Sequence, residues 1–212
     1  MKTSTLLNLV RNRSHIRPIV CVELSPPSDA AAWKRLHALI RVAQNASVDF
    51  LTMTDTGAKR GAGAIEAALR LRRETGVPII AHLACAQRTA DELLRDLAKL
   101  EAGDIDHILI VRGDIDPARM LPQSFAHASD AIRFLRERGY RFTIGSTAYP
   151  DGHPADESPT VDLKVMRRKY DAGADYFVTQ AVFDHDRYSD HVLAAHEEEG
   201  IAVPVFPGMF VV

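Results

Sequence analysis

Side chains able to do chemistry recur at one kind of place in this sequence, the carboxyl end of an apolar run. Six successive runs end in this way, with Glu23, Thr54 and Asp55, His82, Arg112 and Asp114, Tyr149, and Thr179 with Gln180. One polar residue at such a place means little, because every apolar run has to end. Six in succession predict a shared set of polar groups, with carboxyls for proton transfer, imidazole for hydrogen bonding and guanidinium for anions.

Two of these residues have alternative interpretations. Glu23 interrupts an apolar run, either as a carboxylate paired with Arg112 or another base, or as a general acid whose pKa is raised by apolar surroundings. From the sequence alone, we give these two interpretations about even weight. Asp114, taken by itself, is most simply the cap of the next helix.

Metal and thiol chemistry have little support in the sequence. His82 and Cys85 have the spacing of half a metal site, but no second half follows, and His82 is also compatible with a core histidine bonded to a carbonyl. Cys21 is far from Cys85, so no disulfide framework is predicted. We expect the histidines of a polar late segment to face solvent: His185, His191 and His196.

The residues between the polar positions indicate the elements that hold them. Seven near-continuous apolar runs predict parallel strands buried on both faces. The runs are 18–24, 48–54, 77–83, 104–111, 140–146, 174–180 and 201–206. Glycines that close helix-like segments precede five of the runs: Gly76, Gly103, Gly139, Gly173 and Gly200.

Apolar residues at helical spacing predict helices over 29–46, 89–102 and 160–172. The helix at 89–102 opens with Thr89 and carries Glu92 three positions later, the pattern of a capping box.

Alternating strands and helices predict an α/β fold with a parallel sheet. A dinucleotide-binding sheet would show G-x-G-x-x-G after an early strand, and the glycine cluster at 57, 61 and 63 has a different spacing. A (β/α)8 barrel instead predicts polar residues at the carboxyl ends of many strands, converging on one mouth. Because such barrels have about 250 residues, we expect a single barrel domain over 1–212 with seven strands, lacking the eighth unit at its C-terminal end.

The composition sets limits on the function. The chain has 212 residues, 46% of them apolar, and a net charge of −2. These values are typical of a globular protein and argue against a disordered chain or a dedicated nucleic-acid binder. The sequence has no apolar stretch of membrane-spanning length and no secretory signal. We therefore expect a cytoplasmic protein without nucleic-acid, membrane or metal partners.

Taken together, the strand ends resemble those of the methylenetetrahydrofolate reductases, flavin-dependent (β/α)8 barrels of one-carbon metabolism. The similar segments, in the family's order, are VELSPP (22–27), AHLAC (81–85), TADEL (89–93), VRGD (111–114), ASD (128–130), AYPDGHP (148–154), DLKVMRRKYDAGAD (162–175), VTQAVFD (178–184) and VPVFPG (203–208). The resemblance implies hydride transfer from NAD(P)H to FAD and then to 5,10-methylenetetrahydrofolate, giving 5-methyltetrahydrofolate. It also implies a homo-oligomer.

The resemblance implies a role for each matching residue. Glu23 would be the proton donor to the folate, Asp114 would lie near the flavin and the pterin, and Gln180 would contact the folate and the nicotinamide in turn. These three residues and Phe183 would bind the substrate. The positions expected to hold FAD are Thr54, His82, Arg112, Gly113, Asp114, Ala128, Tyr149, His153, Asp162, Arg168 and Lys169, the last two near its diphosphate.

Two other functions stay open at this point. One is a non-catalytic folate- or flavin-binding barrel fragment or subunit, and the other is a flavin-independent reductase. The sequence also departs from the pattern of some relatives, because Asp55 stands where they carry tyrosine.

Overall fold

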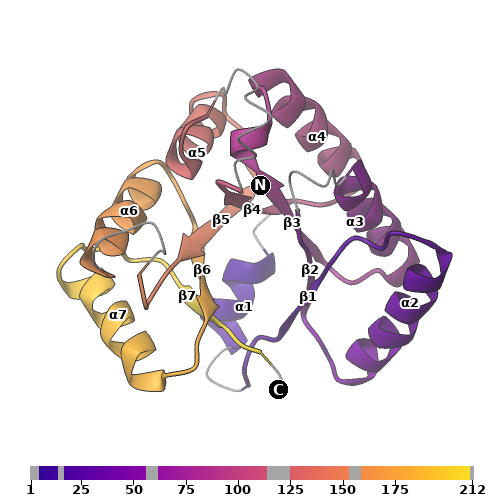
Figure 1. The fold of residues 1–212 in the computed structure, drawn as a ribbon, viewed down its shortest axis with the longest axis horizontal. Helices are drawn as coiled ribbons and strands as arrows, with labels where there is room; N and C mark the ends of the chain where they lie inside the picture. Colours follow the sequence, from indigo (N-terminus) through magenta and orange to yellow (C-terminus); the bar gives the residue numbers. More distant parts are fainter. Residues whose placement is uncertain (1–4, 14–16, 56–61, 114–124, 153–158, 211–212) are drawn as a thin grey trace. The chain divides into compact units, whose positions relative to one another are not determined.

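The structure is a computed structural model that describes residues 5–13, 17–55, 62–113, 125–152 and 159–210 (Figure 1). Seven strands alternate with helices. The strands are β1 (Cys21–Leu24), β2 (Phe50–Met53), β3 (Ile79–Ala84), β4 (His107–Val111), β5 (Thr143–Ala148), β6 (Tyr176–Ala181) and β7 (Val205–Gly208). The helices are α1 (Thr5–Arg13), α2 (Ala30–Asn45), α3 (Ala62–Thr75), α4 (Ala90–Ala102), α5 (Ala128–Glu137), α6 (Pro159–Asp171) and α7 (His185–Glu197), with a short 3-10 turn, η2 (Cys85–Gln87).

The strands confirm the predicted fold class. Each of the seven apolar runs overlaps one strand, and the sheet order is β1-β2-β3-β4-β5-β6-β7. The β1–β2, β2–β3, β5–β6 and β6–β7 pairs are parallel. Seven parallel strands in chain order, each followed or preceded by a helix, are the arrangement expected of seven units of a (β/α)8 barrel.

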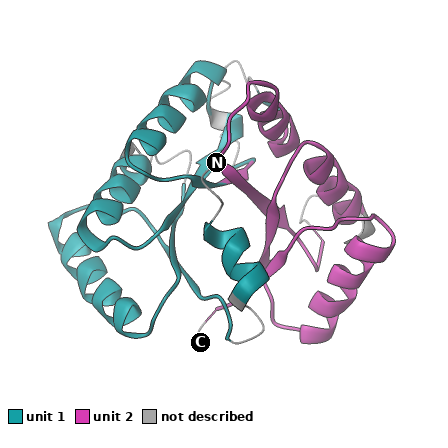
Figure 2. Ribbon diagram, turned by 180° about the vertical axis from the view of Figure 1, so that it is seen from behind, with its two compact units in different colours: residues 1–108, 112–126 teal, residues 109–111, 127–212 magenta. Residues whose placement is uncertain are grey.

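The chain divides into two compact units, which are described separately below (Figure 2). Unit 1 comprises residues 1–108 and 112–126, and unit 2 comprises residues 109–111 and 127–212. The sequence-based expectation of a single domain stays a prediction.

In unit 1, helix α4 forms as its sequence predicts. The Thr89 hydroxyl accepts from the Glu92 amide at 3.2 Å, and the Glu92 carboxylate accepts from the Thr89 amide at 2.8 Å. Leu93, Leu97 and Leu100 are buried on one face of the helix. The capping box and the apolar stripe therefore act together, since one fixes where the helix starts and the other fixes which side is covered.

Helix α1 was not predicted from the sequence. Leu6 is almost fully buried, and its amide donates to the Nε2 atom of His107 at 3.3 Å. The His107 ring packs beside Phe50, with ring centroids 5.3 Å apart. A nine-residue helix depends on such tertiary contacts, because isolated helices of this length are marginal in water.

In unit 2, one arginine joins the end of α5 to the starts of β5 and β6. The Arg136 guanidinium donates to the carbonyls of Gly173 and Phe142 at 3.0 and 2.9 Å and pairs with Asp175 at 2.6 Å. The same Asp175 carboxylate accepts from the Ile144 amide at 2.8 Å.

Among the described residues, no helix is both long and apolar enough to cross a membrane.

Candidate active site

In unit 1, the strand register places several of the predicted site residues on one face of the sheet. Glu23 is paired with Thr52, and Thr52 with Ile80. Paired residues of a parallel ladder share a face, and every second residue of a strand returns to it. His82, two positions further along β3, therefore shares the face that carries Glu23. Thr54 lies one residue past the end of β2, where its amide still donates to the Leu24 carbonyl of β1 at 2.9 Å, so the same alternation extends to it.

Glu23 lies on this face with no charged partner among the residues that the structure describes. Its side chain is exposed, and within the described part of the chain it forms no ion pair or hydrogen bond, so the structural pairing with Arg112 is not found there. Neighbouring protein atoms still displace part of its hydration, and this desolvation raises the pKa of the Glu23 carboxyl. A carboxyl of raised pKa that solvent or a ligand can reach has the properties required of a proton donor.

His82 is a neutral imidazole on the same face. Burial lowers its pKa to about 4, although the nearby charge of Asp55 acts in the opposite direction. At neutral pH the ring can therefore donate one hydrogen bond and accept another, without carrying charge. Within the described residues, no group of three or more His, Cys, Asp or Glu side chains could hold a metal ion.

Thr54 provides a test of whether this face fits a hydrogen-bonding cofactor. Its Oγ1 atom is buried and has no hydrogen-bond partner among the described residues. Leaving a buried hydroxyl unsatisfied costs about 1–3 kcal/mol. A bound ligand that hydrogen-bonds to Thr54 would remove this cost, so the face fits a polar group such as the predicted FAD.

The end of β4 contributes two further predicted residues. Arg112 is exposed, and its carbonyl accepts from the Ala86 amide at 2.9 Å. Gly113 has a φ of +80° and lies directly against Ala84, the last residue of β3. Asp114, the second predicted catalytic carboxylate, lies outside the described residues, so its role stays a prediction.

In unit 2, two of the predicted cofactor residues are buried and one is exposed. Asp162, in the first turn of α6, is buried and accepts from the Tyr149 amide at 2.9 Å. Lys169 is also buried, and its amine donates to the Thr147 carbonyl at 2.7 Å. Arg168 is exposed. The two adjacent cations are thus in different environments, and only Arg168 is fully accessible to an anionic ligand.

The predicted substrate residues of unit 2 are on the surface. Gln180, near the end of β6, is exposed beside a register irregularity that separates Val178 from Ala181. Phe183 is 78% exposed, which is unusual for a large apolar side chain.

Two predicted cofactor residues remain. Ala128 is buried as the first residue of α5. His153 lies outside the described residues.

One expectation from the sequence is wrong. His191, expected to face solvent, is buried, with its Nε2 atom 3.5 Å from an Asp162 oxygen and 3.1 Å from the Met166 sulfur. Burial lowers the pKa of His191. The residue lies on a helix of mostly polar composition, so periodicity gave little indication that this position faces the protein.

Sequence reasoning also missed Arg88. This half-buried arginine pairs with Asp55 and Asp96 between the ends of the strands and helix α4. It follows no strand directly and belongs to no motif that we singled out. The position of Asp55 at a strand end was the one available signal.

Comparison with known proteins agrees with the resemblance in the sequence. A family model for methylenetetrahydrofolate reductase matches residues 9–212. The 5,10-methylenetetrahydrofolate reductase of Escherichia coli K12 is 35% identical over 142 residues, which cover 66% of this chain and 46% of that protein. The Buchnera aphidicola protein of the same name is 28% identical over 196 residues, covering 90% and 64%. The chain thus spans about half the length of the E. coli relative, and less than two thirds of the Buchnera relative.

Solved structures share the fold at low identity. An uncharacterized protein from Clostridium thermocellum that binds two copies of 5-methyl-5,6,7,8-tetrahydrofolic acid has a TM-score of 0.68 and 21% identity, covering 96% of this chain and 69% of that one. A 2,3-dimethylmalate lyase has a TM-score of 0.58 and 13% identity, covering 96% and 81%. The family match over residues 9–212, together with the polar strand ends of the fold, shows that this chain belongs to the methylenetetrahydrofolate reductase family.

Proposed function

We propose that this protein reduces 5,10-methylenetetrahydrofolate to 5-methyltetrahydrofolate with electrons from NAD(P)H and with FAD as cofactor. The observation that carries the proposal is the face in unit 1 that holds both Glu23, whose carboxyl has a raised pKa, and Thr54, whose buried hydroxyl has no hydrogen-bond partner among the described residues. Membership of the family supports the same reaction.

The proposed roles in unit 1 follow from protonation and hydrogen bonding. Glu23 delivers a proton to the folate, since desolvation raises the pKa of its carboxyl and so favours the protonated form. Thr54 and the neutral ring of His82 orient the cofactor by hydrogen bonds, and Arg112 and Gly113 bind it at the end of β4. Asp114 would modulate the cofactor and contact the folate.

The proposed roles in unit 2 depend on whether each side chain is exposed or buried. Gln180 and Phe183 are accessible to substrate, and Arg168 is accessible to the cofactor's diphosphate. Two buried side chains would shape the backbone that binds FAD: Asp162 fixes the Tyr149 amide, and Lys169 fixes the Thr147 carbonyl. Ala128 and His153 would contribute to the same binding site. The chemistry that bound FAD supplies is hydride transfer between the nicotinamide and the folate.

The test is the visible spectrum of the purified full chain and its change during the two half-reactions. We expect a flavin spectrum that is bleached anaerobically by NADH or NADPH and restored by 5,10-methylenetetrahydrofolate, with 5-methyltetrahydrofolate as the product in mass spectrometry. A colourless but active protein would support a flavin-independent reductase. A yellow protein that cannot reduce folate would support a flavin-binding module, and a colourless, inactive protein that does not bind FAD would overturn the proposal.

The proposal extends to the assembly and the location of the protein. We expect a cytoplasmic homo-oligomer, and light scattering of the purified chain measures the oligomeric state.

A further inference from the structure

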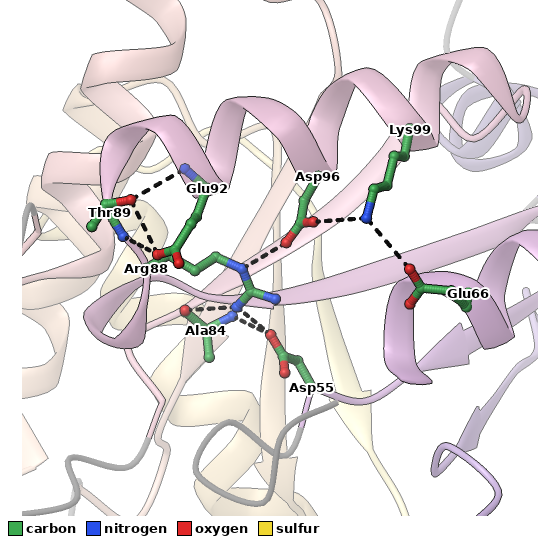
Figure 3. Close-up of polar contacts among 8 residues, drawn as sticks. All are labelled: Asp55, Glu66, Ala84, Arg88, Thr89, Glu92, Asp96 and Lys99. Atoms are coloured by element: carbon green, nitrogen blue, oxygen red, sulfur yellow. Dashed lines mark hydrogen bonds and ion pairs between the residues drawn. The ribbon is translucent and has the colours of Figure 1, made fainter. Parts of the chain in front are cut away.

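Arg88 is the centre of a polar cluster at the carboxyl ends of β2 and β3 (Figure 3). Its Nη1 atom lies 2.5 Å from the Asp55 carboxylate and donates to the Ala84 carbonyl at 2.9 Å. Its Nε atom donates to Asp96 of α4 at 3.0 Å. The Asp55 carboxylate also accepts from the Ala84 amide at 2.9 Å.

These contacts form a closed network, which we call the Arg88 clamp: Arg88, Asp55, Ala84 and Asp96. Asp55 and Arg88 each bond to the backbone of Ala84, one at its amide and the other at its carbonyl. One guanidinium thereby ties Asp55, two residues past the end of β2, to the last residue of β3 and to the middle of α4. The Asp55 and Arg88 side chains are only 3% and 13% exposed, so water competes little for these bonds.

The clamp adjoins residues that face the proposed ligand. Thr54 directly precedes Asp55, and His82 lies two residues before Ala84 on the same strand. Gly113 packs against Ala84. A shift of Ala84 or Asp55 would therefore move the groups on which the proposed site depends.

We propose that Arg88 and Asp55 are positioning residues, which fix the ends of β2 and β3 so that Thr54 and His82 hold the cofactor in place. This inference rests on the proposed function for the identity of the ligand. Arg88 and Asp55 act through their neighbours and need not touch the ligand themselves. Groups that orient the ligands of a metal change affinity by about 10- to 100-fold when they are removed, and we expect an effect of this order here.

The clamp also has an electrostatic consequence for His82. The Asp55 carboxylate after β2 is a charged group that influences the His82 ring, and it pairs with Arg88. The Asp55 charge favours protonation of His82. Because Arg88 pairs with Asp55, we expect its positive charge to oppose that effect. Removing Arg88 alone should raise the pKa of His82, whereas removing the Asp55 charge should not.

The test uses the full chain and compares Arg88→Met with Arg95→Met. Arg95 is a matched control, because it is an exposed arginine on the same helix. Fluorescence titration of the apoprotein with FAD should show binding weakened about tenfold or more by Arg88→Met and changed less than twofold by Arg95→Met. Equal effects of the two variants would overturn the proposal.

An NMR titration of the His82 ring separates positioning from a general loss of stability. We expect Arg88→Met to raise the pKa of His82 by about one unit, and Asp55→Asn added to it to reverse the change. No change in Arg88→Met would overturn the inference. This measurement needs no cofactor, so it decides on the clamp even if the wild-type chain binds no FAD and the proposed function fails.

Arg88→Lys covers the case in which Arg88→Met does not fold. Lysine keeps the charge but cannot bond to Asp55, Ala84 and Asp96 in one plane. We expect weaker FAD binding with an unchanged pKa of His82. Wild-type FAD affinity in Arg88→Lys would show that the bonding geometry of Arg88 is not required, and would overturn the proposal.

Discussion

Gly113→Ala tests how closely the end of β4 approaches β3. Gly113 has a φ of +80°, a conformation that residues with a Cβ rarely adopt. A Cβ atom at this position would lie 2.6 Å from the Cβ atom of Ala84 and 3.5 Å from its Cα atom. Neither obstacle is the flexible tip of a long side chain, so relief requires the backbone to move.

Two costs are expected, and a second glycine separates them. The left-handed conformation costs a residue with a Cβ about 1–2 kcal/mol. Overpacking against a fixed neighbour adds about 1–3 kcal/mol. Gly76 has a φ of +68° in the same unit, but nothing lies within 4 Å of its added Cβ. Gly76→Ala should therefore lose about 1–2 kcal/mol of unfolding free energy, and Gly113→Ala about 2–5 kcal/mol.

Urea unfolding of the full-length variants, followed by circular dichroism, measures both losses. At this chain length each kcal/mol corresponds to about 2–4 °C in Tm, so thermal melts should separate the two variants. Equal losses in Gly113→Ala and Gly76→Ala would refute the reasoning, because they would show that the neighbour at β3 yields without cost.

Three further predictions concern titratable and charged groups. Glu23→Gln should leave flavin reduction by NAD(P)H within about twofold and slow folate reduction about 100-fold or more in stopped-flow assays; equal slowing of both half-reactions would instead indicate a structural role. Because His82 has a pKa of about 4 in the folded chain against an ordinary 6.5, the folded state binds fewer protons than the unfolded state, and stability falls as the pH decreases from 6.5 to 4. This loss of unfolding free energy reaches about 3 kcal/mol at pH 4 and should be missing in His82→Asn, so parallel pH–stability curves of the wild type and the variant would contradict it. Lys169→Met should lose about 1–3 kcal/mol of unfolding free energy because the Thr147 carbonyl loses its buried donor. Arg168→Met should change stability by less than about 0.5 kcal/mol but lower FAD retention after dialysis, and similar stability losses in the two variants would argue against this division.

Local patterns in the sequence predicted most of the fold. The apolar runs located all seven strands to within a few residues, because parallel strands are covered on both faces and so carry few polar residues. The capping box of Thr89 and Glu92 located the start of α4 because its hydrogen bonds join residues three apart. Helix α1 escaped prediction, since its stability depends on Leu6 and on His107, a hundred residues away.

The candidate site was predicted unevenly for a related reason. By itself, the sequence determined which residues stand at the strand ends, and the family motifs suggested what they bind. Only the tertiary structure decided the environment of each side chain. In the structure Glu23 does not form the pair with Arg112 that the sequence had allowed. His191 and Lys169 are buried, and Arg168 is exposed. The structure also brings Asp55 to Arg88, 33 residues apart. The physical reason is that desolvation and ion pairing depend on which atoms surround a group in space, and the spacing of residues along the chain does not record those distances.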